Sequence, residues 1–290
     1  MKGQGFSRRV ITGLKKIPEG MLQNGVHTRT VDILHTGDIL EVNLPEPPKR
    51  IPLCDKNVEI LYENDDVIVY NKPEDMPVHQ SGGHIFGTLD SVYAAHCART
   101  GQITSFRAIN RLDKDTTGIV VAAKNQFAAG KLWKAVTKRY IAVVEGFPEP
   151  DERTIDLPIE REIPMEIKRI VTPDGQEAKT GYRVLARGKS RSLLAFHLYT
   201  GRTHQIRVHM AYIGHPLTGD PLYGTPSELI NRQALHCVRA WFPDVLTGER
   251  VQIDAPLPED FAKLLSLEGI SWNPSMLTET AEPESPSEID

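Results

Sequence analysis

This sequence of 290 residues has few cysteines, and their number and spacing argue against both disulfide bonds and cysteine-bound metal. The three cysteines, Cys54, Cys97 and Cys237, lie far apart, and no Cys-x-x-Cys pair occurs. An odd number of cysteines at such distances argues against a disulfide framework and against a thiolate metal centre. We therefore predict neither.

Long apolar segments are also missing. No run approaches the ~20 apolar residues that a membrane-spanning helix needs, and the first residues, from Met1 to Gly5, contain no apolar signal-peptide core. The hydrophobic content of 40% and the charged content of 25% are ordinary for a soluble globular protein. We expect a cytoplasmic protein with no membrane partner, built from one large domain and one small one.

The sequence has no excess of basic residues, because 34 Lys or Arg face 38 Asp or Glu and the net charge is −4, but the charge is unevenly distributed. Residues 277–290 carry five acidic side chains and no Lys or Arg, so the chain without them would have a charge of +1. Residues 1–16 carry five Lys or Arg and no acid. A near-neutral body with a basic N-terminal edge permits RNA binding without requiring it.

The polar stretch from Asn110 to Gly118 leads directly into the apolar segment from Ile119 to Ala123. That segment has the length and residue types of a buried strand, so the polar residues are expected on a loop that a core element holds in place. Arg111 and Asp113 are two positions apart, and a carboxylate beside a guanidinium stays ionised, as a nucleophile or general base requires. Taken alone, this stretch is still better explained as a surface turn with a salt bridge.

A second polar group lies from Gly201 to His209, at the start of a helix predicted over residues 203–213, with Thr203 as its cap. Arg202, His204 and Arg207 should lie close together there, and such a helix end suits a phosphate or a carboxylate. A metal site formed by His204, His209 and His215 is disfavoured, because positions five apart do not align on a helix. A structural role for these histidines is the stronger alternative.

The pattern along the chain predicts four segments: a small unit over 1–47, a proline-rich linker over 48–54, a main domain over 55–272, and an acidic disordered tail over 273–290. In the main domain we predict hairpins over 59–71 and 180–199 and single strands over 119–123, 140–144, 235–242 and 250–253. Helices are predicted over 88–98, 126–138, 203–213 and 258–267. Strands and helices mix without a regular alternation, which favours an α+β fold over a doubly wound sheet.

Taken together, five motifs in this order resemble the RluA-type RNA pseudouridine synthases over about residues 55–268. They are ILYENDDVIVYNKPEDMPVH, NRLDKDTTGIVVAAKN, KRYIAVVEG, GQEAKTGYRVL and GRTHQIRVHMAYIGHPLTGDPLYG. The resemblance implies a mixed, mainly antiparallel sheet with flanking helices and a central cleft. The first 47 residues resemble the later part of a small S-four-like RNA-binding domain, and a structural cap on the main domain is an equally good interpretation of them.

The resemblance also implies roles for particular residues. Asp113 matches the essential aspartate, Tyr140 the active-site tyrosine, and Arg207 the basic residue that pairs with the aspartate. Arg111 matches the arginine that helps displace the target uridine, and Arg202, His204 and Asn110 are implied RNA contacts. The sequence departs from the family at Asn110, where His is frequent, and at Thr117, where Ser is frequent, which bears on the substrate more than on catalysis.

The implied reaction converts uridine to pseudouridine in structured RNA, without a cofactor or a metal. Large-subunit rRNA is the first expected substrate and tRNA the second, and we expect a monomer. Two other classes are open: a glycoside hydrolase using Asp113 and Asp115, whose carboxylates would have to lie roughly 5–9 Å apart, and a non-catalytic RNA-binding protein. The second of these would require Asp113 or Tyr140 to be replaced, and neither is.

Overall fold

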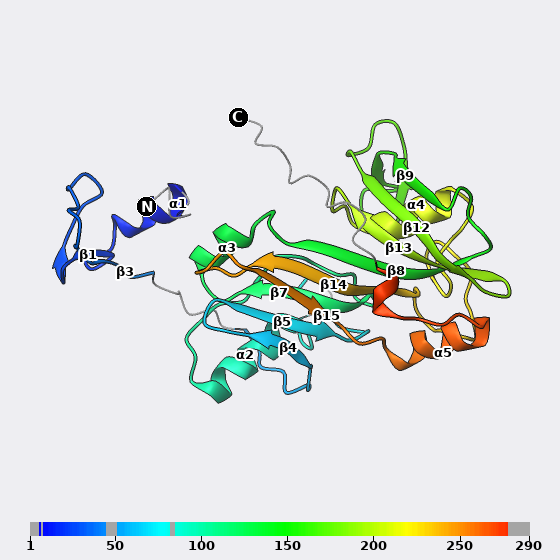
Figure 1. Ribbon diagram of the computed structural model, residues 1–290, viewed down its shortest axis with the longest axis horizontal. Coiled ribbons are helices and arrows are strands. Elements are labelled where there is room, and N and C mark those ends of the chain that lie inside the picture. Colours follow the sequence, from blue (N-terminus) through cyan, green and yellow to red (C-terminus); the bar gives the residue numbers. More distant parts are fainter. Residues whose placement is uncertain (1–5, 7, 45–50, 82–84, 278–290) are drawn as a thin grey trace.

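The computed structural model describes residues 6, 8–44, 51–81 and 85–277. Residues 48–50 of the proline-rich linker, the loop residues 82–84 and residues 278–290 of the predicted tail lie outside this range. Figure 1 shows a small sheet at one end of the molecule and, apart from it, a large sheet that forms the main body.

The helices are α1 (Arg8–Leu14), α2 (Leu89–Thr100), α3 (Gln126–Leu132), α4 (Gln205–Tyr212) and α5 (Glu259–Glu268), followed by the 3₁₀ turn η2 (Pro274–Met276). The strands are β1 (Met21–Gln23), β2 (Val26–His27), β3 (Leu40–Val42), β4 (Ile60–Glu63), β5 (Val67–Lys72), β6 (Arg107–Ala108), β7 (Thr117–Ala123), β8 (Thr137–Glu145), β9 (Glu152–Asp156), β10 (Ile159–Arg161), β11 (Arg169–Val171), β12 (Lys179–Arg187), β13 (Arg191–Leu198), β14 (Leu235–Pro243) and β15 (Arg250–Asp254). Within the described residues, no helix is long and apolar enough to cross a membrane.

The main sheet has ten strands in the order β4-β5-β7-β14-β8-β13-β12-β9, with β15 added beside β14 and β6 beside β7. The pair β7 and β14 is parallel, and the other pairs of this sheet are antiparallel. The prediction of an α+β fold with a mixed, mainly antiparallel sheet is therefore confirmed.

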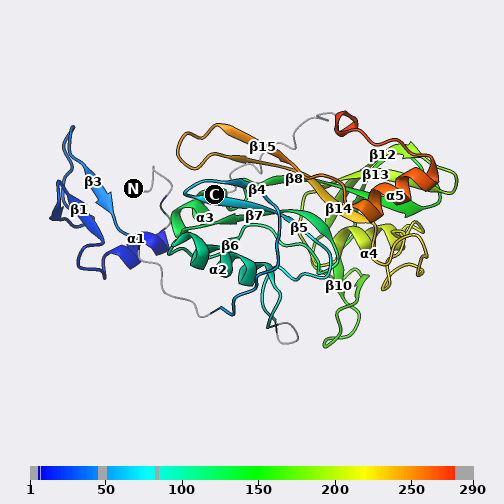
Figure 2. The same ribbon diagram turned by 90° about the horizontal axis from the view of Figure 1, so that it is seen from below.

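Both faces of the sheet are covered, which explains the continuous apolar run of β7. All seven residues of β7 are buried. Side chains of α2, α3 and α4 share one core with β5 and β7, and Figure 2 shows α2 and α4 on the same side of the sheet. Helix α5 packs in a second core against alternate residues of β8, such as Ile141 and Val143.

Gly118 lets two central strands approach closely just after the polar loop. Its φ is +106°, and a Cβ at this position would lie 2.2 Å from the carbonyl oxygen of Cys237 in β14. Only glycine fits such a backbone position without displacing the neighbouring strand. The glycine therefore fixes how the loop before β7 meets β14.

The main sheet opens at its centre. Strand β13 pairs with β8 only from Glu145 to Tyr140 of β8. The start of β8, from Thr137 to Arg139, is paired with β14 on its other side and not with β13. The end of β13 pairs with β12 instead. The two halves of the sheet thus separate just beyond Tyr140, and a cleft forms there.

Three predicted elements differ from the structure. The helix predicted to Lys138 ends at Leu132, because Trp133 is extended and Lys134 has a φ of +67°. Helix α4 begins at Gln205 rather than at Thr203, and His204 occupies its N-cap position with a φ of +58°. The tail predicted from residue 273 is wrong for its first residues, because η2 forms and Leu277 is buried in the core of α5.

The N-terminal unit is a three-stranded sheet in the order β2-β1-β3 with α1 beside it. Asn24 and Gly25 both have positive φ and form the tight turn that connects β1 to β2. Val10, Leu14 and Met21 form a small core of their own, and the ring of Phe6 lies 4.5 Å from that of Phe127 in α3. An S-four-like RNA-binding role and a capping role both remain predictions for this unit.

Candidate active site

The polar loop before β7 is held by a side chain of its own. Nδ2 of Asn110 donates to the carbonyl of Ile119 at 3.0 Å, and its Oδ1 accepts from the N–H of Val121 at 2.9 Å. Asn110 is buried. Both observed contacts of its amide are with β7, which is a positioning role, and an RNA contact by Asn110 stays a prediction.

Three further side chains hold the loop in place, and none of them was identified from the sequence. Nζ of the buried Lys72 donates to the carbonyls of Pro73, Met76 and Lys114, each at 2.8 Å. Arg232 approaches the carbonyl of Asp115 at 3.5 Å, and Gln233 donates to Oγ1 of Thr116 at 3.0 Å. The contacts of these side chains with residues 114–116 join distant segments, so they leave no local sequence pattern. Only the Lys72-Pro73 pair at a strand end could have drawn attention to Lys72.

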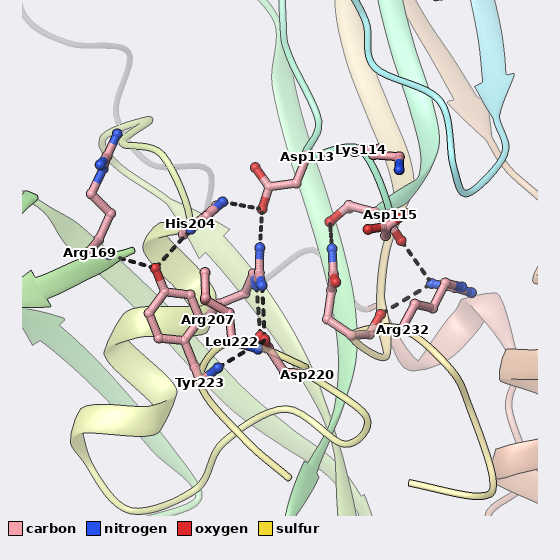
Figure 3. Close-up of polar contacts among 12 residues, drawn as sticks. Asp113, Lys114, Asp115, Arg169, His204, Arg207, Asp220, Leu222, Tyr223 and Arg232 are labelled. Atoms are coloured by element: carbon pink, nitrogen blue, oxygen red, sulfur yellow. Dashed lines mark hydrogen bonds and ion pairs between the residues drawn. The ribbon is translucent and has the colours of Figure 1, made fainter. Parts of the chain in front are cut away.

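Asp113 and Arg207 meet, as the resemblance implied. Nη1 of Arg207 donates to Oδ2 of Asp113 at 3.1 Å. The same guanidinium holds Asp220 with two bonds, at 2.7 and 2.8 Å, and Figure 3 shows Arg207 between the two carboxylates. Burial alone would lower the pKa of Arg207, but the bonds and charges of Asp220 and Asp113 raise it. The guanidinium is therefore a fixed cation that orients the Asp113 carboxylate.

Asp220 was not identified from the sequence, although it holds Arg207 from inside the protein core. Its side chain is fully buried, and its Oδ1 also accepts from the N–H groups of Leu222 at 2.9 Å and Tyr223 at 3.2 Å. The sequence did contain a signal for Asp220, because this aspartate precedes a proline inside a motif that the family shares.

His204 also faces Asp113, with Nε2 3.9 Å from Oδ2. Its Nδ1 lies 2.8 Å from the hydroxyl of Tyr223, and that oxygen accepts from the N–H of Arg169 at 2.8 Å. Burial lowers the pKa of His204 and raises that of Tyr223 to about 12. A protonated Tyr223 can therefore donate to Nδ1, which leaves the Nε2–H of a neutral imidazole directed toward Asp113.

Tyr140 lies on β8, next to the point where the sheet opens, and only 5% of it is exposed. Burial raises its pKa well above the ordinary value, and its hydrogen-bond partner Cys237 and the charge of Asp113 act in the same direction. The phenol is therefore a neutral hydrogen-bond donor. The raised pKa disfavours the phenolate that would be needed to remove a proton.

Arg111 and Arg202 line the mouth of the cleft and also a smaller cavity of about 610 Å³ beside it. Arg111 is exposed and makes no hydrogen bond or ion pair with any residue that the structure describes. Nε of Arg202 donates to the carbonyl of Glu177 at 2.8 Å. Of the three cationic or imidazole side chains predicted to cluster, His204 and Arg207 meet at Asp113, and Arg202 is bound elsewhere.

The two remaining histidines of the disfavoured metal site have structural contacts. His209 is buried, with Nδ1 2.9 Å from Oγ1 of Thr180 and Nε2 2.9 Å from the carbonyl of Leu157. Nδ1 of His215 lies 2.9 Å from the carbonyl of Glu145. Across the described part of the chain, no group of three or more His, Cys, Asp or Glu is placed to hold a metal ion.

The cleft around Asp113 has a volume of about 1610 Å³ and a strongly cationic lining. Eight Lys or Arg side chains line it, and Asp113 is its one carboxylate among the described residues. Asp115, the second carboxylate that a glycoside hydrolase would need, does not line the cleft; its Oδ1 accepts from the N–H of Asp75 at 3.3 Å. A cleft of this charge fits a polyanion with one reacting position.

Known proteins share this chain's motifs and fold. Residues 66–212 match the family model described as RNA pseudouridylate synthase. The Bacillus subtilis protein YlyB, described as an uncharacterized RNA pseudouridine synthase, is 42% identical over 83% of this chain and 83% of its own length. The ribosomal large subunit pseudouridine synthase D of Vibrio vulnificus is 36% identical over 71% of this chain and 69% of its own.

A solved structure agrees with these sequence matches. Human RNA pseudouridylate synthase domain containing 1 superposes with a TM-score of 0.60 at 28% identity, over 75% of this chain and 89% of that one. The chain belongs to the RluA-type RNA pseudouridine synthase family.

Proposed function

We propose that this pseudouridine synthase acts on specific uridines of structured RNA, with Asp113 as the catalytic group. The observation that carries the proposal is the 3.1 Å contact between Asp113 and Arg207 inside a cleft lined by eight Lys or Arg side chains. The cations would attract the RNA backbone, and the single carboxylate would act on the one nucleotide that reaches it.

The reaction itself requires no external electrons or groups. The bond from uracil N1 to ribose C1′ breaks, the base turns, and C5 bonds to C1′. The proton on C5 is lost and N1 gains one, so the mass of the RNA is unchanged. Asp113 would act at the sugar or at the base, with Arg207 holding its carboxylate in position. Asp113 is the group at this site that can accept the C5 proton, because His204 presents an Nε2–H toward it and Tyr140 stays protonated.

The target uridine must leave its stack to reach a carboxylate inside a cleft, which costs a few kcal/mol. Arg111 is suited to occupy the vacated space, because its planar cation can stack on neighbouring bases and pair with phosphate. Its exposure and its lack of partners among the described residues leave it able to do so. Base displacement by Arg111 is part of the proposal.

Large-subunit rRNA is the proposed substrate. The support comes from two Vibrio relatives whose names specify the ribosomal large subunit, each 36% identical to this chain. Mapping of pseudouridine in rRNA and tRNA from a strain that lacks the protein tests this substrate. Loss of sites in large-subunit rRNA is expected, and loss confined to tRNA would contradict the rRNA proposal.

The reaction class is tested separately with purified protein and uridine-containing RNA. Isomerisation leaves the RNA mass unchanged and releases tritium placed at uridine C5. Release of free uracil would instead indicate hydrolysis of the glycosidic bond and would contradict the proposed chemistry.

A further inference from the structure

One part of the cleft has aromatic and cationic side chains that the reaction at Asp113 does not use. It lies where β8 and β13 separate, and we call it the tryptophan arm. Its defining residues are Trp133, Lys134, Arg139, Tyr199, Trp241 and Arg250, all of which line the same cavity as Asp113.

Arg139 brings an unneutralised charge into this arm. Its Nη1 donates to Nδ1 of His197 at 2.7 Å, and it forms an ion pair with no acidic side chain in the described ranges. Burial and the neighbouring Arg139 lower the pKa of His197 to about 4, so the imidazole is a neutral acceptor that orients the guanidinium. Burial also lowers the pKa of Arg139, and Arg239 and Arg250 add to that effect. A bound anion would relieve this repulsion between cations.

Trp241 holds two of these cations in place. The guanidinium carbons of Arg139 and Arg250 lie 5.5 and 5.2 Å from the centre of its ring. The ring itself is only 6% exposed. Cation–π contacts of this length fix guanidinium groups over the ring, so the two arginines form a preset pair at the cleft surface.

Trp133 and Tyr199 present aromatic rings on the same cavity, with exposures of 66% and 51%. His197 and Lys179 contact part of the Tyr199 ring. Trp133 stands where α3 stops early, and the next residue, Lys134, has a φ of +67°. A lysine in that region costs about 1 kcal/mol or more, and exposure of a large ring to water is also unfavourable. The turn at Lys134 lets β8 pair with β14, whereas packing of the isolated chain does not account for the exposure of the Trp133 ring.

We propose that the tryptophan arm binds an unpaired stretch of RNA next to the target uridine. Arg139 and Arg250 contact its phosphates, and Trp133 and Tyr199 stack on its bases. The inference rests on the proposed function, which brings RNA into this cleft. A base that stacks on a side chain has left the RNA stack, so the preferred substrate is a loop or bulge rather than a continuous duplex.

The test compares binding of two labelled RNAs, a stem–loop with an all-uridine loop and a blunt duplex with the same stem. The variants are Trp133→Ala and Arg250→Gln in the full chain. Phe147→Ala and Arg153→Gln are the matched controls, because both side chains are exposed and neither lines the two described cavities.

Trp133→Ala should weaken binding of the stem–loop by about 5-fold to 150-fold and leave duplex binding within a factor of about two. Trp133→Phe should restore most of the affinity. Arg250→Gln should reduce the slope of log affinity against log salt by about 0.7–0.9. Both controls should behave as the wild-type protein.

The inference is overturned if Trp133→Ala and Arg250→Gln match their controls in affinity and salt slope. It is also overturned if Trp133→Ala weakens duplex and stem–loop equally, because unpaired bases would then not be the ligand. Tritium release by the wild-type protein is measured separately. A wild-type protein that binds the stem–loop through these residues but isomerises no RNA contradicts the proposed function and not this binding site.

Discussion

Arg207 is shared by two carboxylates that differ in burial. Asp220 is fully buried and holds the guanidinium with two bonds, whereas the Asp113 side chain is 25% exposed and receives one. This difference separates the supporting role of Asp220 from the proposed catalytic role of Asp113, because removal of a partner from a buried pair is costly while a more exposed partner contributes little to folding.

We predict that Asp220→Asn lowers the free energy of unfolding by about 3 kcal/mol. The buried Arg207 would lose its main counter-charge, and turnover would fall with the orientation of Asp113. Asp113→Asn is the matched control, with an expected loss of less than about 1 kcal/mol. Urea denaturation measures both values, and equal losses would show that the two carboxylates support the fold alike.

At Tyr140 we predict that Tyr140→Phe binds RNA normally and loses about 100-fold or more in turnover, because the hydrogen-bond donor is removed while the ring remains. The raised pKa of the phenol also predicts no ionisation of Tyr140 in the wild-type pH–rate profile up to about pH 10.

Tyr182→Phe is the control for the loss of a buried tyrosine hydroxyl, since its OH donates to the carbonyl of Pro150 away from the cleft. Turnover of Tyr140→Phe at the wild-type rate would remove the hydroxyl from the mechanism.

Among the residues, the sequence motifs predicted that Arg207 pairs with Asp113 and that His204 lies near Arg207, but not that His204 faces Asp113. They did not predict Asp220, Lys72, Gln233 or Arg232, since these act through contacts between distant segments. Asn110 shows the same limit. Its type and place in the motif suggested an RNA contact, while its observed bonds are with the backbone of β7.

Among the elements, the strands were predicted well and the helix ends less well. A run such as Ile119–Ala123 is decided by burial on both faces, and burial leaves a clear apolar pattern. Helix α3 shows the opposite case. Ala135 and Val136 continue the helical stripe, yet the chain turns at Lys134 so that β8 can begin at Thr137 and pair with β14. Tertiary pairing overrides local propensity there.

The central strands also predict how stability depends on pH. His236 of β14 is fully buried, with Nδ1 2.8 Å from Oγ1 of Thr117, and burial lowers its pKa to about 3. The unfolded chain takes up a proton near pH 6.5, whereas the folded protein does not until about pH 3. The unfolded state therefore binds more protons between these values, so this contribution is complete above pH 6.5 and is lost as the pH falls.

We expect His236 to account for about 2 kcal/mol of lost stability between pH 7 and pH 5. His236→Asn retains a polar side chain toward Thr117 and cannot titrate, so its free energy of unfolding should depend less steeply on pH. Urea denaturation at a series of pH values measures this. Identical slopes for wild type and variant would show that His236 does not control the acid sensitivity.

For the whole molecule, the distribution of charge matters more than its sum. The net charge is −4, yet the cleft lining holds eight Lys or Arg and one carboxylate. The composition showed the basic N-terminal edge and the acidic C-terminal segment, because each is continuous in sequence. The cationic cleft was not visible in this way, since its residues come from separate strands, loops and helices.

A chain that begins at Leu53 should fold and keep its active site but bind RNA more weakly at low salt, since Arg8, Lys15 and Lys16 would no longer contact phosphate. The difference should shrink as salt rises. Removal of residues 278–290 should leave binding unchanged or slightly stronger, because five acidic charges are lost.

Affinities of the two truncated chains and the full chain across a salt series check this. An insoluble N-terminal truncation would indicate that the contact of Phe6 with Phe127 makes the first unit a cap on the core. A soluble truncation with unchanged affinity and salt slope would contradict the RNA-binding role.

The central claim, that Asp113 performs the isomerisation in this cleft, is tested most directly by single-turnover tritium release from uridine C5 at saturating RNA, with wild-type protein and Asp113→Asn side by side. Both proteins should bind the RNA with similar affinity and unfold at similar urea concentrations. The wild-type protein should release tritium and form pseudouridine, and Asp113→Asn should release none. Substantial release by a folded, RNA-bound Asp113→Asn protein would contradict the assignment of Asp113 as the catalytic group.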